Sequence, residues 1–218
     1  CVCTRRDVEA GQSAPHEGDV LFYPGVCRGR FADYAAACGV LPEGRLPAWR
    51  FRVEERAAIS FDDGFCGRQT QDVSASSGDF VLARDPQGAG YMLAVVVDDA
   101  AMGITEVLRG DDLLQATPRQ MLLYRALGLA PPAFTHVPLV VSEDGRRLAK
   151  RHGDTRLAAY RRAGATPQRV LGLLAAWLGA LESPKEIDMD ELVRRFDIDR
   201  IPRGQIVFSR QDDALLKG

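Results

Sequence analysis

The pattern of apolar and polar positions differs between three parts of the chain. Residues 1–75 contain few periodic stretches: Phe51–Val53 alternates as a short strand does, and Asp62–Gly64 predicts a turn. In residues 76–155, apolar runs separated by turn residues predict four strands, at 80–84, 91–98, 103–108 and 136–141. Because residues 93–97 are continuously apolar, we expect that strand to be covered on both faces of a sheet. Residues 156–218 are predicted to be mainly helical.

Capping residues predict where the helices begin and end. Three positions carry a side chain that caps helix N-termini and is followed by Pro or by a capping partner, and these are Thr117, Thr166 and Asp188. The expected C-terminal ends are, in the same order, Gly128, Leu181 and Phe196. A last short strand is predicted at Ile206–Phe208.

The order of these elements predicts an α/β fold with three domains. A strand, a helix, a strand and a basic loop within 76–155 are typical of one half of a nucleotide-binding α/β domain. Residues 1–75 contain few apolar positions for a core, so we expect a small domain there that needs an additional crosslink. Residues 156–218 form the expected helical tail.

Composition narrows the class of protein. Of 218 residues, 46% are hydrophobic and 27% are charged, which favours a globular domain over a disordered chain. The sequence has no apolar run of about 18 residues, so no membrane span is predicted. An odd number of cysteines, five, and the lack of an apolar leader at Cys1 indicate a reducing compartment, and we expect a cytoplasmic protein.

Positive charge is concentrated around the start of the predicted helical tail. Between residues 146 and 169 the only acid is Asp154, and it stands against eight basic residues, namely Arg146, Arg147, Lys150, Arg151, Arg156, Arg161, Arg162 and Arg169. Such a block attracts phosphate groups. The alternative is a solvated basic helix face without a ligand.

The cysteine spacing suggests a metal site near the beginning of the chain. Cys1, Cys3 and Cys27 could supply three corners of a zinc tetrahedron. The fourth ligand could be His16, Tyr23, Cys38 or an acid, and residue chemistry alone favours His16. The alternative is a set of free thiols that binds no metal.

Two further residues suit the recognition of an amino acid. Arg109 could clamp a carboxylate with two parallel hydrogen bonds, and Tyr91 offers a rigid polar tip on an apolar ring. The alternative for Tyr91 is a strand-edge position packed in the core. The alternative for Arg109 is an ion pair with Asp111 or Asp112.

Taken together, residues 78–153 resemble the glutamyl-tRNA synthetase family of class I aminoacyl-tRNA synthetases. The matching segments are Gly78–Leu82, Tyr91–Asp99, Gly103–Thr105, Val107–Leu114, Thr117–Gln120 and His136–Leu139. The resemblance implies the second half of a Rossmann-like catalytic domain, in which Tyr91 and Arg109 bind the substrate glutamate. Asp98, Asp99 and His136 are interpreted as structural or orienting residues.

The basic loop Arg147–Arg151 resembles the KMSKS loop of the same family. The resemblance places Lys150 at the position of the lysine that contacts ATP and stabilises charge on the departing pyrophosphate. Arg147 keeps the charge of the first lysine, whereas Ala149 lacks the hydroxyl of the usual serine.

The pattern of Cys1, Cys3, Tyr23 and Cys27 resembles the zinc site of glutamyl-queuosine tRNA(Asp) synthetases, in which the tyrosine is the fourth ligand. The resemblance implies one Zn²⁺ on these four residues and ATP, with Mg²⁺, as co-substrate. It further implies glutamate and queuosine-containing tRNA(Asp) as partners, and a monomeric enzyme. The short stretch that follows Lys150 also agrees with this branch of the family.

The HIGH motif of the family does not occur in these 218 residues. We therefore expect a C-terminal fragment with low activity and an exposed apolar sheet edge that favours self-association. One alternative is a fragment of a glutamyl-tRNA synthetase. The other is a non-catalytic, zinc-containing remnant that binds RNA.

Overall fold

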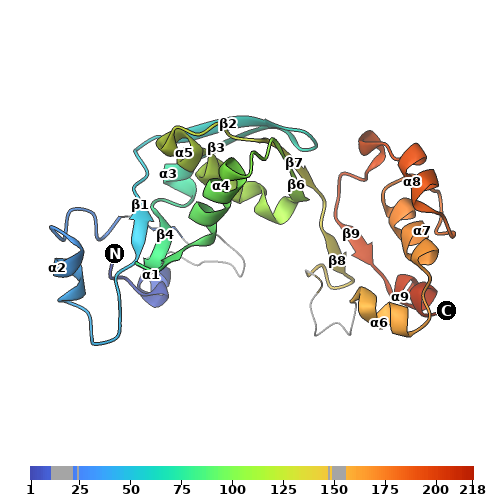
Figure 1. The fold of residues 1–218 in the computed structure, drawn as a ribbon, viewed down its shortest axis with the longest axis horizontal. Helices are drawn as coiled ribbons and strands as arrows, with labels where there is room; N and C mark the ends of the chain where they lie inside the picture. Colours follow the sequence, from blue (N-terminus) through green and yellow to red (C-terminus); the bar gives the residue numbers. More distant parts are fainter. Residues whose placement is uncertain (11–21, 24, 147, 149–155) are drawn as a thin grey trace. The chain divides into compact units, whose positions relative to one another are not determined.

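The computed structural model describes residues 1–10, 22–23, 25–146, 148 and 156–218. These residues form two compact units (Figure 1). Unit one contains residues 1–108 and 113–135, and unit two contains residues 109–112 and 136–218. Contacts thus group the chain differently from the predicted segments 1–75, 76–155 and 156–218, whose separate functional roles stay a prediction. None of the described helices is long and apolar enough to cross a membrane.

Unit one is built on two small sheets. Three antiparallel strands lie in the order β1-β4-β5, with bounds Trp49–Phe51, Phe80–Asp85 and Gly88–Ala89. Four further strands lie in the order β3-β2-β7-β6, with bounds Gly67–Asp72, Ala58–Asp63, Ala133–Val137 and Glu106–Gly110. The hairpin of β2 and β3 turns near Gly64, as the sequence predicts, and β2 runs parallel to β7.

The helices of unit one are short except for two. The short ones are α1, α2 and α3, at Arg5–Ala10, Tyr34–Cys38 and Val73–Ser76, and a 3-10 helix covers Asp111–Ala116. The longer helices α4, Tyr91–Ala101, and α5, Thr117–Leu127, pack against each other. Helix α5 ends at Gly128 as predicted, because Gly128 adopts the left-handed conformation with φ 67°.

One prediction is wrong: residues 91–98 form the first turns of α4 and not a strand. The continuous apolar run fits a buried helix as well as a buried strand, and periodicity cannot separate the two. Packing decides the outcome, because Val96 is 1% exposed and belongs to the core of the unit. Gly90 precedes the helix in an extended conformation, and its carbonyl oxygen accepts the first helical hydrogen bond, from Ala94.

Two other strands differ from prediction in their limits. The strand expected at 103–108 starts only at Glu106 and becomes β6. The run 136–141 is divided between β7 and β8, Val140–Ser142, because Pro138 has no N–H to donate to a continuing ladder.

The core of unit one draws on the whole unit. Nine buried residues form it, namely Val53, Ile59, Phe61, Val73, Phe80, Val96, Leu123, Tyr124 and Phe134. Four of them come from residues 1–75, so the expectation that this segment supplies little core is wrong. Strand β2 buries every second residue, and two of these, Ile59 and Phe61, belong to the same cluster as Leu123 and Tyr124 of α5.

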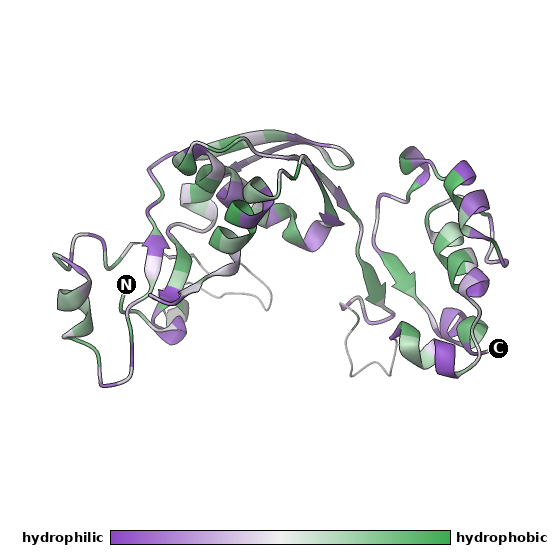
Figure 2. Ribbon diagram, viewed as in Figure 1, coloured by the Kyte–Doolittle hydropathy of each residue, from purple (hydrophilic) through white to green (hydrophobic). Residues whose placement is uncertain are grey.

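Unit two is mainly helical, as predicted for residues 156–218. Its helices α6 to α9 have the bounds Leu157–Arg162, Pro167–Trp177, Met189–Arg195 and Arg210–Lys217, and a 3-10 helix covers Ile198–Arg200. Strand β9, Ile206–Phe208, runs parallel to β8. Both strands are strongly hydrophobic, whereas the helices carry apolar and polar faces (Figure 2).

The capping residues of unit two act as predicted. The Thr166 side chain accepts a hydrogen bond from Arg169 N–H at 3.1 Å, and the Asp188 carboxylate accepts one from Glu191 N–H at 2.7 Å. The helix that begins at Thr166 ends at Trp177, four residues earlier than Leu181.

Candidate functional site

Three cysteines meet in unit one. The sulfur atoms of Cys1, Cys3 and Cys27 all lie within 4.8 Å of one another, and Cys3 Sγ is 3.6 Å from Cys27 Sγ. Backbone pairing holds the first residues in place, because the Cys1 nitrogen donates to Ala48 O at 2.7 Å and Ala48 N–H donates to Cys1 O at 2.8 Å. The structure therefore brings together the three thiols that the sequence predicts as metal ligands.

The hydroxyl of Tyr23 lies beside the same cluster. The Cys1 thiol donates to this hydroxyl at 3.3 Å, and Cys27 N–H donates to it at 2.8 Å. Tyr23 is 2% exposed, and its backbone bridges to Gly78. A Cβ on Gly78 would stand 2.1 Å from the Tyr23 carbonyl oxygen, so this close approach requires glycine there.

Three sulfur atoms thus lie close together, with the phenol oxygen of Tyr23 beside one of them. In a tetrahedral zinc site with Zn–S bonds near 2.3 Å, neighbouring ligand atoms are about 3.8 Å apart. The 3.6 Å between Cys3 and Cys27 and the 3.3 Å between Cys1 and Tyr23 are close to that spacing. The donor set fits a metal ion of the zinc type. His16, the alternative fourth ligand, lies outside the described residues, and Cys38 is not part of the cluster.

The pKa values of these groups are shifted in different directions. Burial and the neighbouring Cys27 thiol raise the pKa of Cys3. Burial is also the main cause that raises the pKa of Tyr23. Burial acts in the same direction on Cys27, but hydrogen bonds from the Tyr23 hydroxyl and the Val2 N–H outweigh it, and the pKa of Cys27 is lowered overall. Of Cys3 and Cys27, Cys27 is therefore the thiol that loses its proton more readily.

Two arginines and one aspartate support the cluster, and the sequence reasoning missed all three. The Arg50 guanidinium lies over the Tyr23 ring at 3.9 Å. Arg28 Nε donates to Asp79 Oδ2 at 2.8 Å, and Val53 N–H donates to Asp79 Oδ1 at 2.8 Å. Although burial acts to raise it, the pKa of Asp79 is lowered by these hydrogen bonds, those from Arg28 first. The only sequence signal was the Gly78-Asp79 pair at the start of a predicted strand.

Tyr91 opens helix α4. It is 55% exposed, so the alternative of a tyrosine packed in the core is wrong. The turn before it is tight, because a Cβ on Gly90 would lie 2.9 Å from the Leu82 carbonyl oxygen. The phenol is therefore held at a defined helix start and is accessible to a ligand.

Arg109 is held by His136. Its Nε donates to His136 Nε2 at 2.9 Å, and His136 is fully buried. Because a guanidinium only donates, His136 Nε2 must carry the lone pair and the imidazole proton sits on Nδ1. His136 was predicted to be structural or orienting, and its contact with Arg109 agrees with an orienting role.

The residues of the predicted ATP-binding loop cannot be placed alongside these. Lys150, Arg147 and Ala149 lie outside the described residues. Tyr91 belongs to unit one and Arg109 to unit two, so their joint action on glutamate stays a prediction.

Comparison with known proteins shows what the chain is similar to. Residues 41–212 match the family model described as tRNA synthetases class I (E and Q), catalytic domain. The chain belongs to this family. A glutamyl-Q tRNA(Asp) synthetase of Symbiobacterium thermophilum is 45% identical over 100% of the chain and 67% of the relative's length. A glutamate–tRNA ligase of Heliobacterium modesticaldum is 38% identical over 95% of the chain and 42% of the relative.

A solved structure agrees in fold. A glutamate tRNA ligase from Elizabethkingia meningosepticum, crystallised in complex with its amino acid, has a TM-score of 0.71 and 25% identity. The match covers 97% of this chain and 46% of that one. The fold class is thus that of a class I synthetase catalytic domain with mixed α/β content, as predicted. The chain spans between about two fifths and two thirds of the length of these relatives.

Proposed function

We propose that the protein uses ATP to activate glutamate and transfers it to the queuosine base at the wobble position of tRNA(Asp). One observation carries the proposal. Cys1, Cys3, Cys27 and Tyr23 gather in a chain that is 45% identical, over its whole length, to a protein named glutamyl-Q tRNA(Asp) synthetase. The relative named glutamate–tRNA ligase reaches 38%.

The proposed reaction has two steps. The glutamate carboxylate attacks the α-phosphate of ATP, and pyrophosphate leaves as the adenylate forms. A hydroxyl of the queuosine cyclopentenediol then attacks the activated acyl carbon, so that an ester forms and AMP leaves. Lys150 stabilises the charge on the departing pyrophosphate, with Mg²⁺ bound to ATP. No side chain needs to act as a nucleophile.

Arg109 and Tyr91 are the proposed glutamate-binding residues. The Nε of Arg109 donates to His136. We assign the terminal nitrogens of the same guanidinium to the carboxylate of glutamate that does not react with ATP. His136 is then a positioning residue, because it acts on glutamate only through Arg109. Tyr91, exposed at the start of α4, supplies a hydroxyl on a rigid ring.

The proposed role of zinc is structural. Bound by Cys1, Cys3, Tyr23 and Cys27, the ion would tie the first residues of the chain to the turn that contains Cys27. We include in the proposal that the enzyme is a monomer of the reducing cytoplasm. The odd number of cysteines, five, supports the reducing compartment.

The test uses the full-length gene product that contains these residues. Glutamate-dependent exchange of pyrophosphate into ATP should occur, and labelled glutamate should appear on tRNA(Asp) with queuosine but not on tRNA(Asp) without it. Lys150→Ala should lower the exchange rate by about 100-fold, the typical effect of removing one transition-state contact. Arg162→Ala, in the same basic block on α6, is the matched control.

Other outcomes point to the other candidates. Transfer to the 3′ end of tRNA(Glu), mapped by nuclease cleavage, would identify a glutamyl-tRNA synthetase. Binding of tRNA with no adenylate formed would identify a non-catalytic RNA-binding protein.

A further inference from the structure

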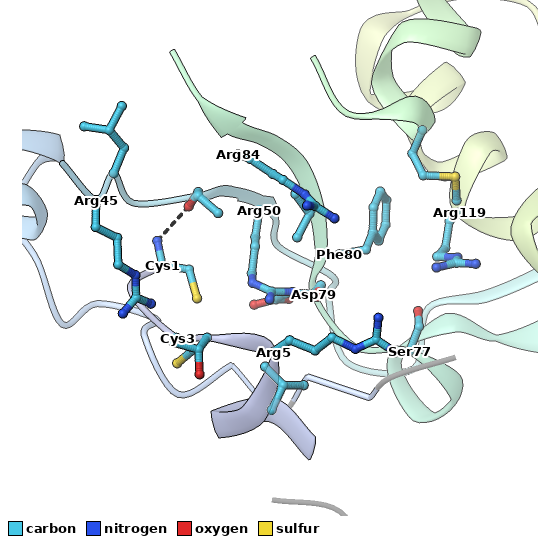
Figure 3. Close-up of a pocket in the computed structure, with 16 residues that line it drawn as sticks. Cys1, Cys3, Arg5, Arg45, Arg50, Ser77, Asp79, Phe80, Arg84 and Arg119 are labelled. Carbon is cyan, nitrogen blue, oxygen red and sulfur yellow. Dashed lines mark hydrogen bonds between the residues drawn. The ribbon is translucent and has the colours of Figure 1, made fainter. Parts of the chain in front are cut away.

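A wide cavity in unit one is lined by an excess of arginines. Its volume is about 820 Å³, and its walls come from the first residues of the chain, α1, the segment before β1, β4, α4 and α5 (Figure 3). Among its lining residues there is a single carboxylate, Asp79, against five guanidinium groups, those of Arg5, Arg45, Arg50, Arg84 and Arg119. We call this cavity the arginine pocket.

The carboxylate does not balance this charge. The oxygens of Asp79 accept hydrogen bonds from Arg28, which is outside the pocket lining, and from Val53 N–H. Asp79 is 4% exposed, and its negative charge is compensated by the ion pair with Arg28. Arg50 lies over Tyr23 and close to the cysteine cluster, so thiolates there would offset part of its charge. The pocket as a whole therefore keeps an excess of positive charge.

Arg119 gives the strongest indication that the arginine pocket binds an anion. It lies in the first turn of α5, and its Nε is buried without a hydrogen-bond partner in the part of the chain that the structure describes. Burial lowers the pKa of its guanidinium, and no nearby acid acts against that effect. Burying a guanidinium without an anion or a full set of acceptors costs free energy, so such groups normally have a partner.

The arginines enter the pocket from separate segments. Figure 3 shows Arg119 on one side of the pocket, Arg45 on the other, and Arg5, Arg50 and Arg84 between them. Cations spread over a cavity of this size suit several phosphate groups along a chain better than one small anion. Arginine is the preferred side chain for such contacts, since its planar fork binds two phosphate oxygens at once.

We propose that the arginine pocket binds backbone phosphates of the RNA substrate. This inference rests on the proposed function, which supplies tRNA(Asp) as the partner. Arg84 and Arg119 carry the contact, because they come from β4 and α5 and have no ion pair among the described residues. ATP offers the same phosphate chemistry, so the test must separate the two sources.

The test compares Arg119→Gln and Arg84→Gln with the wild-type full-length gene product. Affinity for queuosine-containing tRNA(Asp) is measured by filter binding over a series of salt concentrations. Each variant should bind about tenfold more weakly at low salt, as expected when a charged hydrogen bond is removed. The slope of log K against log salt should fall by about 1 in magnitude for each phosphate that the variant no longer binds.

Control variants separate binding from folding. Arg68→Gln removes an exposed arginine of the same unit, which is paired with Asp62, and should leave the salt slope as it is. Arg119→Lys keeps the charge and should recover part of the affinity. A purely structural Arg119 would instead lower the melting temperature without changing the slope. If Arg119→Gln does not fold, Arg84→Gln decides, since Arg84 is exposed on β4.

The outcomes distinguish the two proposals. Unchanged tRNA affinity and salt slope in both variants would overturn the RNA-binding role of the pocket, while adenylate formation would still support the proposed function. A raised KM for ATP in pyrophosphate exchange, with tRNA affinity unchanged, would reassign the pocket to nucleotide. If the wild-type protein neither forms the adenylate nor transfers glutamate, the proposed function itself fails.

Discussion

The two units reach their structures by different routes. The core of unit one joins side chains that are distant in sequence, such as Val53 on the approach to β2 and Phe134 in β7. Unit two has two smaller clusters, and the buried residues of the larger one all lie between Ala175 and Leu192. The other cluster joins Tyr160 and Leu173 to Leu216, and β8 pairs with the distant strand β9. Unit two therefore combines one local cluster with long-range contacts, whereas the core of unit one depends on contacts between distant segments.

The cysteine cluster of unit one and the helix starts of unit two differ in the same way. In unit one, Cys1, Tyr23 and Cys27 meet because two separate segments are held by Ala48 and Gly78. In unit two, helix starts are stabilised within a few residues, as in the reciprocal capping of Ser209 and Asp212. Substitutions at long-range contacts should therefore lower the free energy of unfolding more than substitutions at caps. They should also affect a larger part of the structure.

The largest effect is expected at the proposed zinc site. Cys27→Ser removes one of the three clustered thiols, so the protein should lose its zinc and several kcal/mol of unfolding free energy. Metal analysis and hydrogen exchange check this, with faster exchange expected in residues 1–4 and 25–30 and none of the change in α7. Cys38→Ser, outside the cluster, should keep the metal. Full zinc content in Cys27→Ser would contradict the assignment.

A smaller effect is expected at Asp79, whose carboxylate is buried while its partner Arg28 is exposed. Asp79→Asn should lower the free energy of unfolding by about 2 kcal/mol, because it weakens the charged hydrogen bonds that the carboxylate accepts from Arg28 and from Val53 N–H. The folded pKa of Asp79 lies below its ordinary value, so this stabilisation is fully present above the unfolded pKa. It is lost as the pH falls through the folded pKa. In Asp79→Asn the free energy of unfolding should therefore depend less on pH in that acidic range.

Denaturant unfolding between pH 2 and 7 measures this dependence. Asp62→Asn is the matched control, since Asp62 pairs with Arg68 on the exposed face of the hairpin and should change stability by less than about 1 kcal/mol. If the free energy of unfolding falls as steeply with pH in Asp79→Asn as in the wild type, the pH dependence belongs to other carboxylates. One such group is Asp213 of unit two, whose pKa is lowered by Lys217 and Tyr160.

The smallest effect is expected at a helix cap of unit two. Thr166→Ala removes the hydrogen bond to Arg169 N–H and should cost about 1 kcal/mol. Faster hydrogen exchange should be confined to the first turn of α7. Gln168→Ala, at an exposed position of the same turn, should stay within about 0.5 kcal/mol of the wild type. Faster exchange in the core strands of unit one would show that the two units are not as different as their contacts suggest.

Local signals explain most of the correct predictions. The caps at Thr166 and Asp188, the left-handed Gly128 and the strand Ile206–Phe208 were all found, because each depends on a few neighbouring residues. The apolar run after Tyr91 was assigned to the wrong element, because such a run satisfies a helix or a strand and only Val96 in the core decides. Residues 1–75 seemed poor in core positions because their apolar side chains are few. Ile59 and its neighbours in β2 become core only because the sheet is completed by strands from other segments.

By itself, the sequence determined the family, the helical character of residues 156–218, and the identity of the cysteines and of Tyr91 and Arg109 as candidates. Only the tertiary structure decided that the Tyr23 hydroxyl reaches Cys1, that His136 orients Arg109, and that five arginines line one cavity. The physical reason is range. Capping and chain chemistry act between neighbours, whereas a ligand set or a charged pocket exists only after folding brings distant side chains within a few ångströms.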